Sequence, residues 1–232
     1  MIINREDEQY AKRLRLVSSE RVVYMPGIGV DTQFYNPTRI SDKAILQLRQ
    51  ELQLSSHERF FLMVAEFIPR KRHKDALVAF SRLRRPDVHL VFAGEGALLS
   101  DMKMLAERLG IQRYVHFLGY RHDVPILIRA AACVLLVSMQ EGLPRSIMES
   151  LSLQVPVIGA DIRGISDLLN HKCGLLIPSG DIERLADAMA WILDHDEDAR
   201  EMGISGRQAM MHYDLQNVIE LHQQLYNKAL NY

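Results

Sequence analysis

Two glutamates, Glu141 and Glu149, flank the segment of the chain that is best suited to bind an anionic ligand. The segment follows the most apolar run of the sequence, Ala130–Val137, and its own apolar residues then recur at helical spacing. This pattern predicts a buried strand, a loop that contains Gly142, and a helix. Pro144 suits the first turn of that helix, where a backbone N–H is not needed. Free amides and a positive dipole end at such a helix start form an anion site.

The two carboxylates would repel a phosphate unless each of them faces another part of the ligand. Carboxylates accept hydrogen bonds from hydroxyls, so a pair that flanks a diphosphate suggests a sugar on one side and a ribose on the other. A blander interpretation stays open, because an acidic residue near a helix start is often only a dipole partner. Glu149 could equally lie on a solvated helix face.

A run of basic residues, Arg70-Lys71-Arg72-His73-Lys74, forms a second candidate for ligand binding. It comes after the continuous apolar run 60–64, which predicts a strand buried on both faces, and we expect it to open a helix over Asp75–Leu83. Basic side chains at a helix N-terminus oppose the helix dipole, so their placement favours a phosphate contact. The alternative is a solvated helix start without a ligand.

The bulk composition is that of an ordinary globular protein. The 232 residues are 48% hydrophobic and 25% charged, with a formal net charge of −1, so nothing predicts nucleic acid as a partner. No apolar run approaches the roughly 20 residues of a membrane span, and the chain opens without a secretory signal. Cys133 and Cys173 lack metal or redox spacing, which indicates two reduced, inert thiols in a cytosolic type of domain.

Apolar strands alternate with amphipathic helices along the chain and predict an α/β fold, a doubly wound Rossmann-like parallel sheet of about six strands. In such sheets ligands bind beyond the carboxyl ends of the strands, at the topological switch point. The basic run, Gly119-Tyr120 and the Glu141–Glu149 segment all follow predicted strands there. We expect strands at 22–25, 60–64, 88–93, 115–118, 133–137, 155–159 and 174–177, and helices at 4–17, 41–54, 75–83, 165–169, 181–193, 197–211 and 214–230.

Other chemistries find little support in the sequence. Gly94-Glu95-Gly96 lacks the third glycine of a dinucleotide fingerprint, so we interpret it as a strand-to-helix turn. His73 and His116 lie near predicted strand ends, but no histidine pair has metal-ligand spacing. No Ser–His–Asp or Cys–His arrangement is evident.

At the level of ordered motifs the chain resembles the C-terminal half of a family 4 retaining glycosyltransferase with the GT-B architecture. It is most similar to the branch that builds bacterial capsular and surface polysaccharides. The matching segments are Tyr24–Asp31, Val64–Lys71, Phe92–Gly96, Phe117–Gly119, Glu141–Glu149, Val155–Gly159 and Gly174–Pro178.

The resemblance implies a role for each matched residue. Glu141 would face the donor sugar as the catalytic residue, Glu149 would hold the nucleotide ribose, and Lys71 would bind phosphate. Many relatives have an arginine where this chain has Glu66, and Arg70 or Arg72 would substitute for it. The other donor-binding residues implied are Gly142 and Leu143, through their amides at the diphosphate, and Tyr120 and Arg121, beside the base.

The same resemblance implies an organisation and partners. Residues 1–24 would be a remnant of an N-terminal acceptor domain, 25–58 a linker and first helix, 59–213 the nucleotide-sugar donor-binding domain, and 214–232 a helix that packs on the acceptor domain. That absent domain would supply the catalytic histidine and bind a sugar or lipid-linked acceptor. The donor would be a UDP-sugar, with no metal required. The protein would be cytoplasmic, with peripheral contact of its full-length form at the inner membrane face.

Three alternatives stay open at this point. A dehydrogenase-type dinucleotide domain shares the sheet but lacks the glycine fingerprint. A sugar-nucleotide epimerase of GT-B shape has the same architecture and would form the epimer without an acceptor. A non-catalytic nucleotide-binding module is the third.

Overall fold

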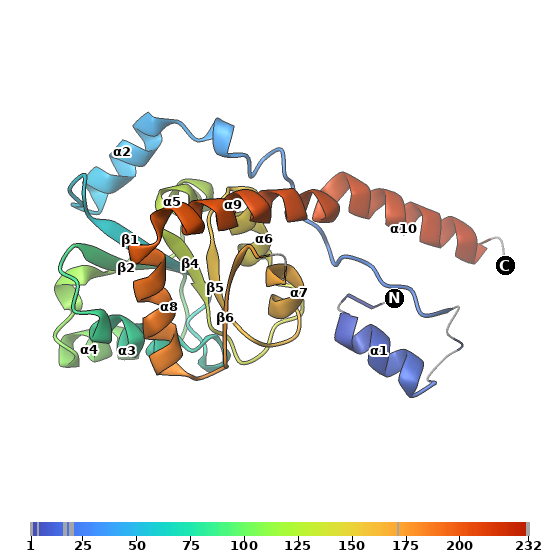
Figure 1. Cartoon of the computed structure of the whole chain (residues 1–232), viewed down its shortest axis with the longest axis horizontal. Helices are drawn as coiled ribbons and strands as arrows, with labels where there is room; N and C mark the ends of the chain where they lie inside the picture. The colour runs from blue at the N-terminus through green and yellow to red at the C-terminus, as the bar shows by residue number, and fades with distance from the viewer. Residues whose placement is uncertain (1, 4, 16–17, 19–20, 171, 231–232) are drawn as a thin grey trace.

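The protein is built around one parallel β-sheet with helices on both faces (Figure 1). The computed structural model describes residues 2–3, 5–15, 18, 21–170 and 172–230. The strand order is β3-β2-β1-β4-β5-β6, which is the order of a doubly wound Rossmann-type sheet and confirms the predicted fold class. The strands are β1 Arg59–Val64, β2 Val88–Ala93, β3 Val115–Phe117, β4 Cys133–Leu136, β5 Val157–Ala160 and β6 Gly174–Ile177.

The helices divide between the two faces of the sheet. Helices α2, α5, α6, α7 and α9 pack on one face, and α3, α4 and α8 pack on the other. Their bounds are α1 Arg5–Arg13, α2 Asp42–Glu51, α3 His73–Leu83, α4 Leu99–Arg108, α5 Val124–Ala130, α6 Arg145–Ser152, α7 Ile165–Leu169, α8 Ile182–Asp194, α9 Asp196–Met210 and α10 Leu215–Leu230. Short 3-10 turns occupy η2 Pro37–Arg39, η3 Pro69–Lys71, η4 Gln112–Tyr114 and η5 Met211–Tyr213.

Strand β1 shows why the sheet carries two separate cores. Phe60 and Leu62 point into the core beneath α2 and α5, while Phe61 and Met63 point into the core beneath α3 and α8. Successive side chains of a strand alternate between its faces, so a continuous apolar run fills both layers. The predicted burial of this strand on both faces is therefore confirmed.

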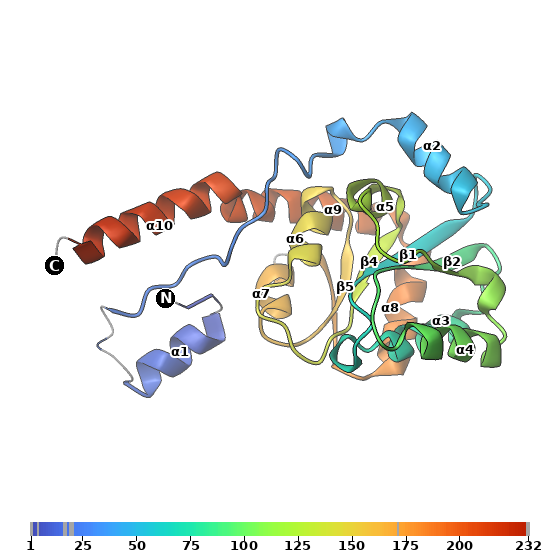
Figure 2. The same cartoon turned by 180° about the vertical axis from the view of Figure 1, so that it is seen from behind.

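The two ends of the described chain lie at one end of the molecule, beyond the edge of the sheet (Figure 2). Helix α10 projects away from the sheet after Val218, its buried residue, and Leu230 near its end is exposed. Helix α1 lies on the same side, and its Asp7 accepts a hydrogen bond from Arg163 at 2.7 Å.

The N-terminal region differs from the sequence-based expectation. The predicted strand over residues 22–25 is wrong: only Tyr24 forms an isolated bridge, with Ile2, so no ladder supports a strand there. The predicted helix ends early at Arg13, because Arg15 takes a left-handed conformation with φ 50°. Residues 4 and 17, the two ends of the predicted helix, lie outside the described residues.

Two boundaries near the candidate site also differ. Helix α3 begins at His73 rather than Asp75, so part of the basic run lies in the 3-10 turn η3 before it. Ala130 ends helix α5 instead of opening the next strand. Asp123 precedes α5 without capping it, because its carboxylate accepts hydrogen bonds from Arg121 instead.

The two cysteines are free and buried, and burial raises the pKa of the Cys133 thiol well above its usual value. Within the described parts of the chain, every helix is too short or too polar to cross a lipid bilayer.

Candidate functional site

The candidate site forms where the strand order reverses direction, between neighbouring strands β1 and β4. The loops that leave these two strands run side by side at the carboxyl edge of the sheet. Met139 N donates to the Arg70 carbonyl at 2.8 Å, and Arg70 Nη1 donates to the Gln140 carbonyl at 3.3 Å. The basic run and the glutamate segment, distant in sequence, are therefore held together at the edge where such sheets bind ligands.

Lys71 and Glu141 form an ion pair at this junction. Lys71 Nζ lies 2.5 Å from Glu141 Oε1, and the two side chains are only 14% and 9% exposed. Arg70 supports the same carboxylate from 3.7 Å, although its own side chain is 49% exposed. The positive charge of Lys71, which would oppose the helix dipole, is thus balanced by the carboxylate of Glu141 from the loop after β4. The two groups lie next to each other in the site.

Arg72 contacts a different partner although it directly follows Lys71. Its backbone takes the left-handed conformation, with φ 56° and ψ 39°, which turns the side chain away from its neighbours in sequence. Its Nε donates to the Asp75 carboxylate. Of the three residues of the basic run that are predicted to bind donor, Lys71 and Arg70 contact Glu141, and Arg72 is paired with Asp75 at the start of α3.

The loop between β4 and α6 is fixed by a close backbone approach. Gly164 has φ 80°, and a side-chain Cβ at this position would lie 1.7 Å from the Gly142 carbonyl oxygen. Only a glycine permits that contact. Helix α6 then begins after Pro144, and no side chain among the described residues caps its first amides. An anion-binding helix start, as predicted from the sequence around Gly142 and Leu143, is thus compatible with the local structure.

Glu149 lies on the buried side of α6, so the solvated-face interpretation is wrong. The residue is 8% exposed, and burial raises the pKa of its carboxyl above the usual value. Two groups oppose that rise: the Tyr35 side chain and Arg145, whose Nη2 lies 3.6 Å from Glu149 Oε1. In return, burial and then Glu149 raise the pKa of Tyr35.

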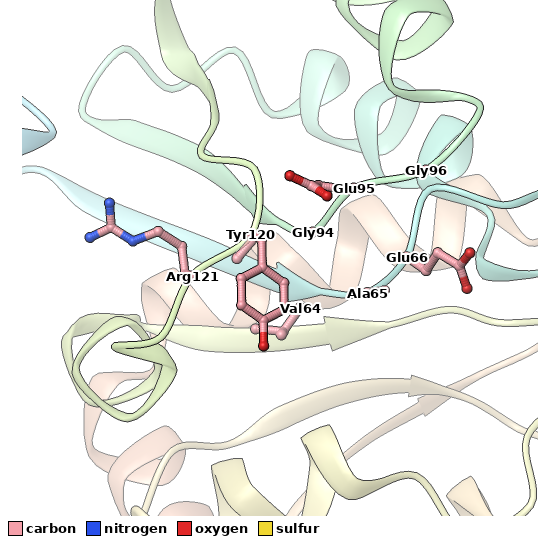
Figure 3. A pocket seen from close by; sticks show the side chains of 9 residues that line it. Val64, Ala65, Glu66, Gly94, Glu95, Gly96, Tyr120 and Arg121 are labelled. Atoms are coloured by element: carbon pink, nitrogen blue, oxygen red, sulfur yellow. The ribbon is translucent and has the colours of Figure 1, made fainter.

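A pocket of about 550 Å³ opens beside the carboxyl ends of β1, β2 and β3 (Figure 3). Its floor depends on Gly94, where φ is 152° and a Cβ would lie 2.0 Å from the Ala65 carbonyl oxygen. Tyr120 stands at the rim and is 68% exposed. The lining residues are Val64, Ala65, Glu66, Ala93, Gly94, Glu95, Gly96, Tyr120 and Arg121.

Arg121 lines this pocket with its stem while its guanidinium points away from the Gly94–Gly96 loop (Figure 3). The guanidinium is paired with Glu51 at 2.5 Å and with Asp123 at 2.7 Å. It therefore joins helix α2 to the loop after β3. Its place beside a base stays a prediction, and in this structure its charge is paired within the pocket wall.

Sequence reasoning missed two components of this region. The turn Gly94-Glu95-Gly96 forms a pocket wall as well as a strand-to-helix connection. Its place directly after a predicted strand could have indicated this, because ligands bind at that edge of the sheet. Tyr35, whose pKa is raised by burial and by Glu149, lies in the loop before η2, far along the chain from Glu149, so no local pattern identifies it.

His73, the histidine of the basic run, is buried in the core. Burial lowers the pKa of His73 to about 4, and the ring stacks on Phe67 with centroids 4.1 Å apart. Within the described residues, no cluster of three or more His, Cys, Asp or Glu side chains could hold a metal ion.

Comparison with known proteins gives a consistent result for both sequence and fold. Residues 45–209 match the family described as glycosyl transferases group 1. The chain is 29% identical over 232 residues to the putative glycosyltransferase EpsD of Bacillus subtilis (strain 168). That alignment covers 99% of this chain and 60% of the relative, so the chain spans about 60% of the length of that protein.

Two solved structures share the architecture. The crystal structure of a glycosyltransferase from Rickettsia africae ESF-5 has a TM-score of 0.90 at 17% identity, and the match covers 98% of this chain and 62% of that one. Anabaena HepE in complex with UDP has a TM-score of 0.85 at 22% identity, covering 100% of this chain and 63% of that one. The six-stranded sheet is thus the Rossmann-like C-terminal domain of a GT-B fold, as expected.

Proposed function

This chain belongs to the glycosyl transferases group 1 family, and on that premise we propose that it binds the nucleotide-sugar donor of a retaining glycosyltransferase. The donor class proposed is a UDP-sugar. The observation that carries the proposal is the Lys71–Glu141 pair at the switch point of the sheet. It brings a cation that could bind a phosphate and a carboxylate that could accept hydrogen bonds from a sugar to the same end of strands β1 and β4.

The diphosphate of the donor would lie between Lys71 and the start of α6. Lys71 supplies a point charge, and the amides of Gly142 and Leu143 supply donors at a helix start that no side chain caps. A phosphate oxygen on Lys71 would share the ammonium with Glu141, so the carboxylate stays next to the ligand. Glu141 would then face the hydroxyls of the donor sugar, and the fixed charges would stabilise the leaving diphosphate.

The nucleoside would extend to both sides of this centre. Glu149 would accept hydrogen bonds from the ribose hydroxyls, and the base would lie toward the pocket with Tyr120 at its rim. Glu66 lines that pocket and adds a negative charge near the position where relatives carry an arginine. Arg70, already within 3.7 Å of Glu141, is the residue placed to compensate for it.

The finer parts of the proposal rest on the resemblance to polysaccharide-building transferases. They are a glycan or lipid-linked acceptor, retention at the anomeric carbon, independence from metal, and action at the cytoplasmic face of a bacterial membrane. The acceptor would be bound by a domain that packs against α1 and α10, whose exposed faces lie at one end of the molecule. The present chain would supply donor binding, and catalysis would require that second domain.

A thermal-shift titration of the chain against UDP, GDP, ADP and NAD tests the proposal. A ligand at about 100 times its dissociation constant adds roughly 2.7 kcal/mol of stability. Each kcal/mol raises the melting midpoint of a domain of this size by about 2–4 °C. We expect a rise of about 5–10 °C with UDP and none with NAD. A rise of the midpoint with NAD alone would contradict donor binding by this chain. The absence of a rise with all four ligands would contradict it as well.

A further inference from the structure

The loop that follows β3 carries Tyr120 and Arg121 on different sides of one short segment. The Tyr120 side chain lines the rim of the pocket of about 550 Å³, whereas the Arg121 guanidinium points away from the Gly94–Gly96 loop (Figure 3). The segment is tied to the pocket floor at its start, because the Gly94 amide donates to the Gly119 carbonyl at 2.8 Å. The position of the Tyr120 ring therefore depends on what holds the other end of the segment.

Two carboxylates hold that other end through the Arg121 guanidinium. Asp123 accepts from Nε and from Nη2, each at 2.7 Å. Glu51 accepts from Nη1 at 2.5 Å and from Nη2 at 3.1 Å, although it lies 70 positions away on helix α2. Both contacts are bidentate, so they fix the plane of the guanidinium as well as its position. The Asp123 contact stays within the loop, and the Glu51 contact is the one that joins the loop to another element.

Helix α2 by itself does not favour a glutamate at this position. Glu51 is its last residue, and a negative charge at a helix C-terminus opposes the helix dipole. The end of the helix is anchored by other residues, since Leu48 and Leu52 are buried in the core. Arg49 donates to the Glu58 carbonyl at 2.8 Å, which holds the turn after the helix. Glu51 therefore presents its carboxylate to the loop after β3 from a fixed support.

We propose that Glu51 is a positioning residue of the donor site, which acts through Arg121 to hold Tyr120 at the edge of the pocket that receives the nucleotide base. The inference rests on the proposed function, because this pocket belongs to the same donor site. It gives Arg121 a positioning role in place of a direct contact with the base. Loss of Glu51 should weaken the hold on the base and spare the diphosphate contacts, which come from the loops after β1 and β4.

Calorimetric titration of the whole chain and its E51Q variant with UDP and with inorganic diphosphate tests this role. The amide keeps the shape of the side chain and loses the charge that holds Arg121. E51Q should bind UDP about fivefold more weakly, at the upper end of the range for a partly exposed ion pair. Its affinity for inorganic diphosphate should equal that of the unaltered chain. E107Q, which alters an exposed glutamate in the last turn of α4, is the matched control and should change neither affinity.

Hydrogen exchange gives a second readout that needs no ligand. Without the Glu51 contact, residues 119–123 should open more often, so their amides should exchange about fivefold faster in E51Q than in the unaltered chain. The amides of η3 and of the start of α6 should exchange at the same rate in both proteins. Equal acceleration in all three regions would indicate general destabilisation and would contradict a positioning role.

Further variants separate the remaining outcomes. R121M removes the same contact from the other side, so it should also lose UDP affinity and spare inorganic diphosphate, and it supplies the test if E51Q does not fold. The double variant E51Q/R121M should lose no more than R121M, because Glu51 acts through Arg121. Equal losses for the two ligands in E51Q, or no loss at all, would overturn the role of Glu51 and leave the proposed function intact. If the unaltered chain binds no nucleoside diphosphate, the proposed function fails and this inference with it.

Discussion

Glu141 and Glu149 belong to one short segment but have opposite surroundings. Glu141 faces two cations from the loop after β1, with Lys71 at 2.5 Å and Arg70 at 3.7 Å. Glu149 lies on the core side of α6, where the cation Arg145 is 3.6 Å from its carboxylate and burial raises the pKa of the carboxyl. Both side chains are poorly exposed, at 9% and 11%, so the two carboxylates differ in their charged partners and not in their exposure.

This difference indicates how one helix and its preceding loop can serve two parts of a ligand. A carboxylate beside a lysine can remain next to a diphosphate, because the shared cation offsets the repulsion between the anions. A buried carboxylate with spare acceptor positions suits hydroxyls, and it would be a poor neighbour for phosphate. The contrast is therefore the physical basis for assigning Glu141 to the sugar beside the diphosphate and Glu149 to the ribose.

Replacing Lys71 with an uncharged residue should have the largest effect on the difference between Glu141 and Glu149. K71M leaves Glu141 poorly exposed with only Arg70 nearby, and it also removes the proposed phosphate contact. We expect UDP binding to weaken by about 3 kcal/mol and the free energy of unfolding to fall by about 2 kcal/mol. The reason is that the poorly exposed Glu141 carboxylate loses the cation that balances its charge. Calorimetry and urea denaturation measure the two quantities. The control K74M alters an exposed lysine in the same run, and equal losses in it would refute the assignment.

Removing the second carboxylate should have the next largest effect on binding. E149A is expected to weaken UDP binding by about 1–3 kcal/mol, because the ribose hydroxyls lose a charged acceptor. Titration with UDP measures the change, and E201A on the exposed face of α9 is the matched control. Unchanged affinity in E149A would remove Glu149 from the ribose site.

Neutralising the first carboxylate should change selectivity more than affinity. In E141Q the amide keeps the shape of the side chain but loses its charge, so free UDP should bind within about threefold of the unaltered chain. The preference for a UDP-sugar over UDP should disappear. Parallel titrations with UDP and UDP-glucose measure this difference, with E197Q as the control. Equal weakening of both ligands would show that Glu141 does not discriminate the sugar.

The smallest expected effect is a pH dependence of stability that belongs to Glu149 alone. Burial raises its pKa in the folded chain, so between the unfolded and folded pKa values the folded state binds more protons. The stability of the unaltered chain relative to E149Q should therefore rise as the pH falls through this window, and fall as the pH increases. Urea denaturation at a series of pH values tests it. Comparison with E149Q cancels the shared histidines, and a flat difference would contradict the buried, charged carboxylate.

Much of the fold followed from local sequence patterns. The continuous apolar run 60–64 predicted a strand buried on both faces, and the structure confirms it in β1. The strand predicted over 88–93 is β2. Helix α7 and strand β6 begin and end at the predicted residues. The strand predicted over 22–25 was wrong, because apolar character alone does not supply a neighbouring strand to pair with.

The sequence alone determined the order of strands and helices and the set of loops at the carboxyl edge of the sheet, because hydrophobic period and turn residues are properties of adjacent positions. Only the tertiary structure decided which charges meet. Lys71 and Glu141 are 70 positions apart, as are Arg121 and Glu51, and Arg207 donates to the carbonyl of the distant Tyr35. Such contacts depend on how distant segments of the chain pack against each other. They produce no periodic pattern in the sequence, so the sequence alone does not predict them.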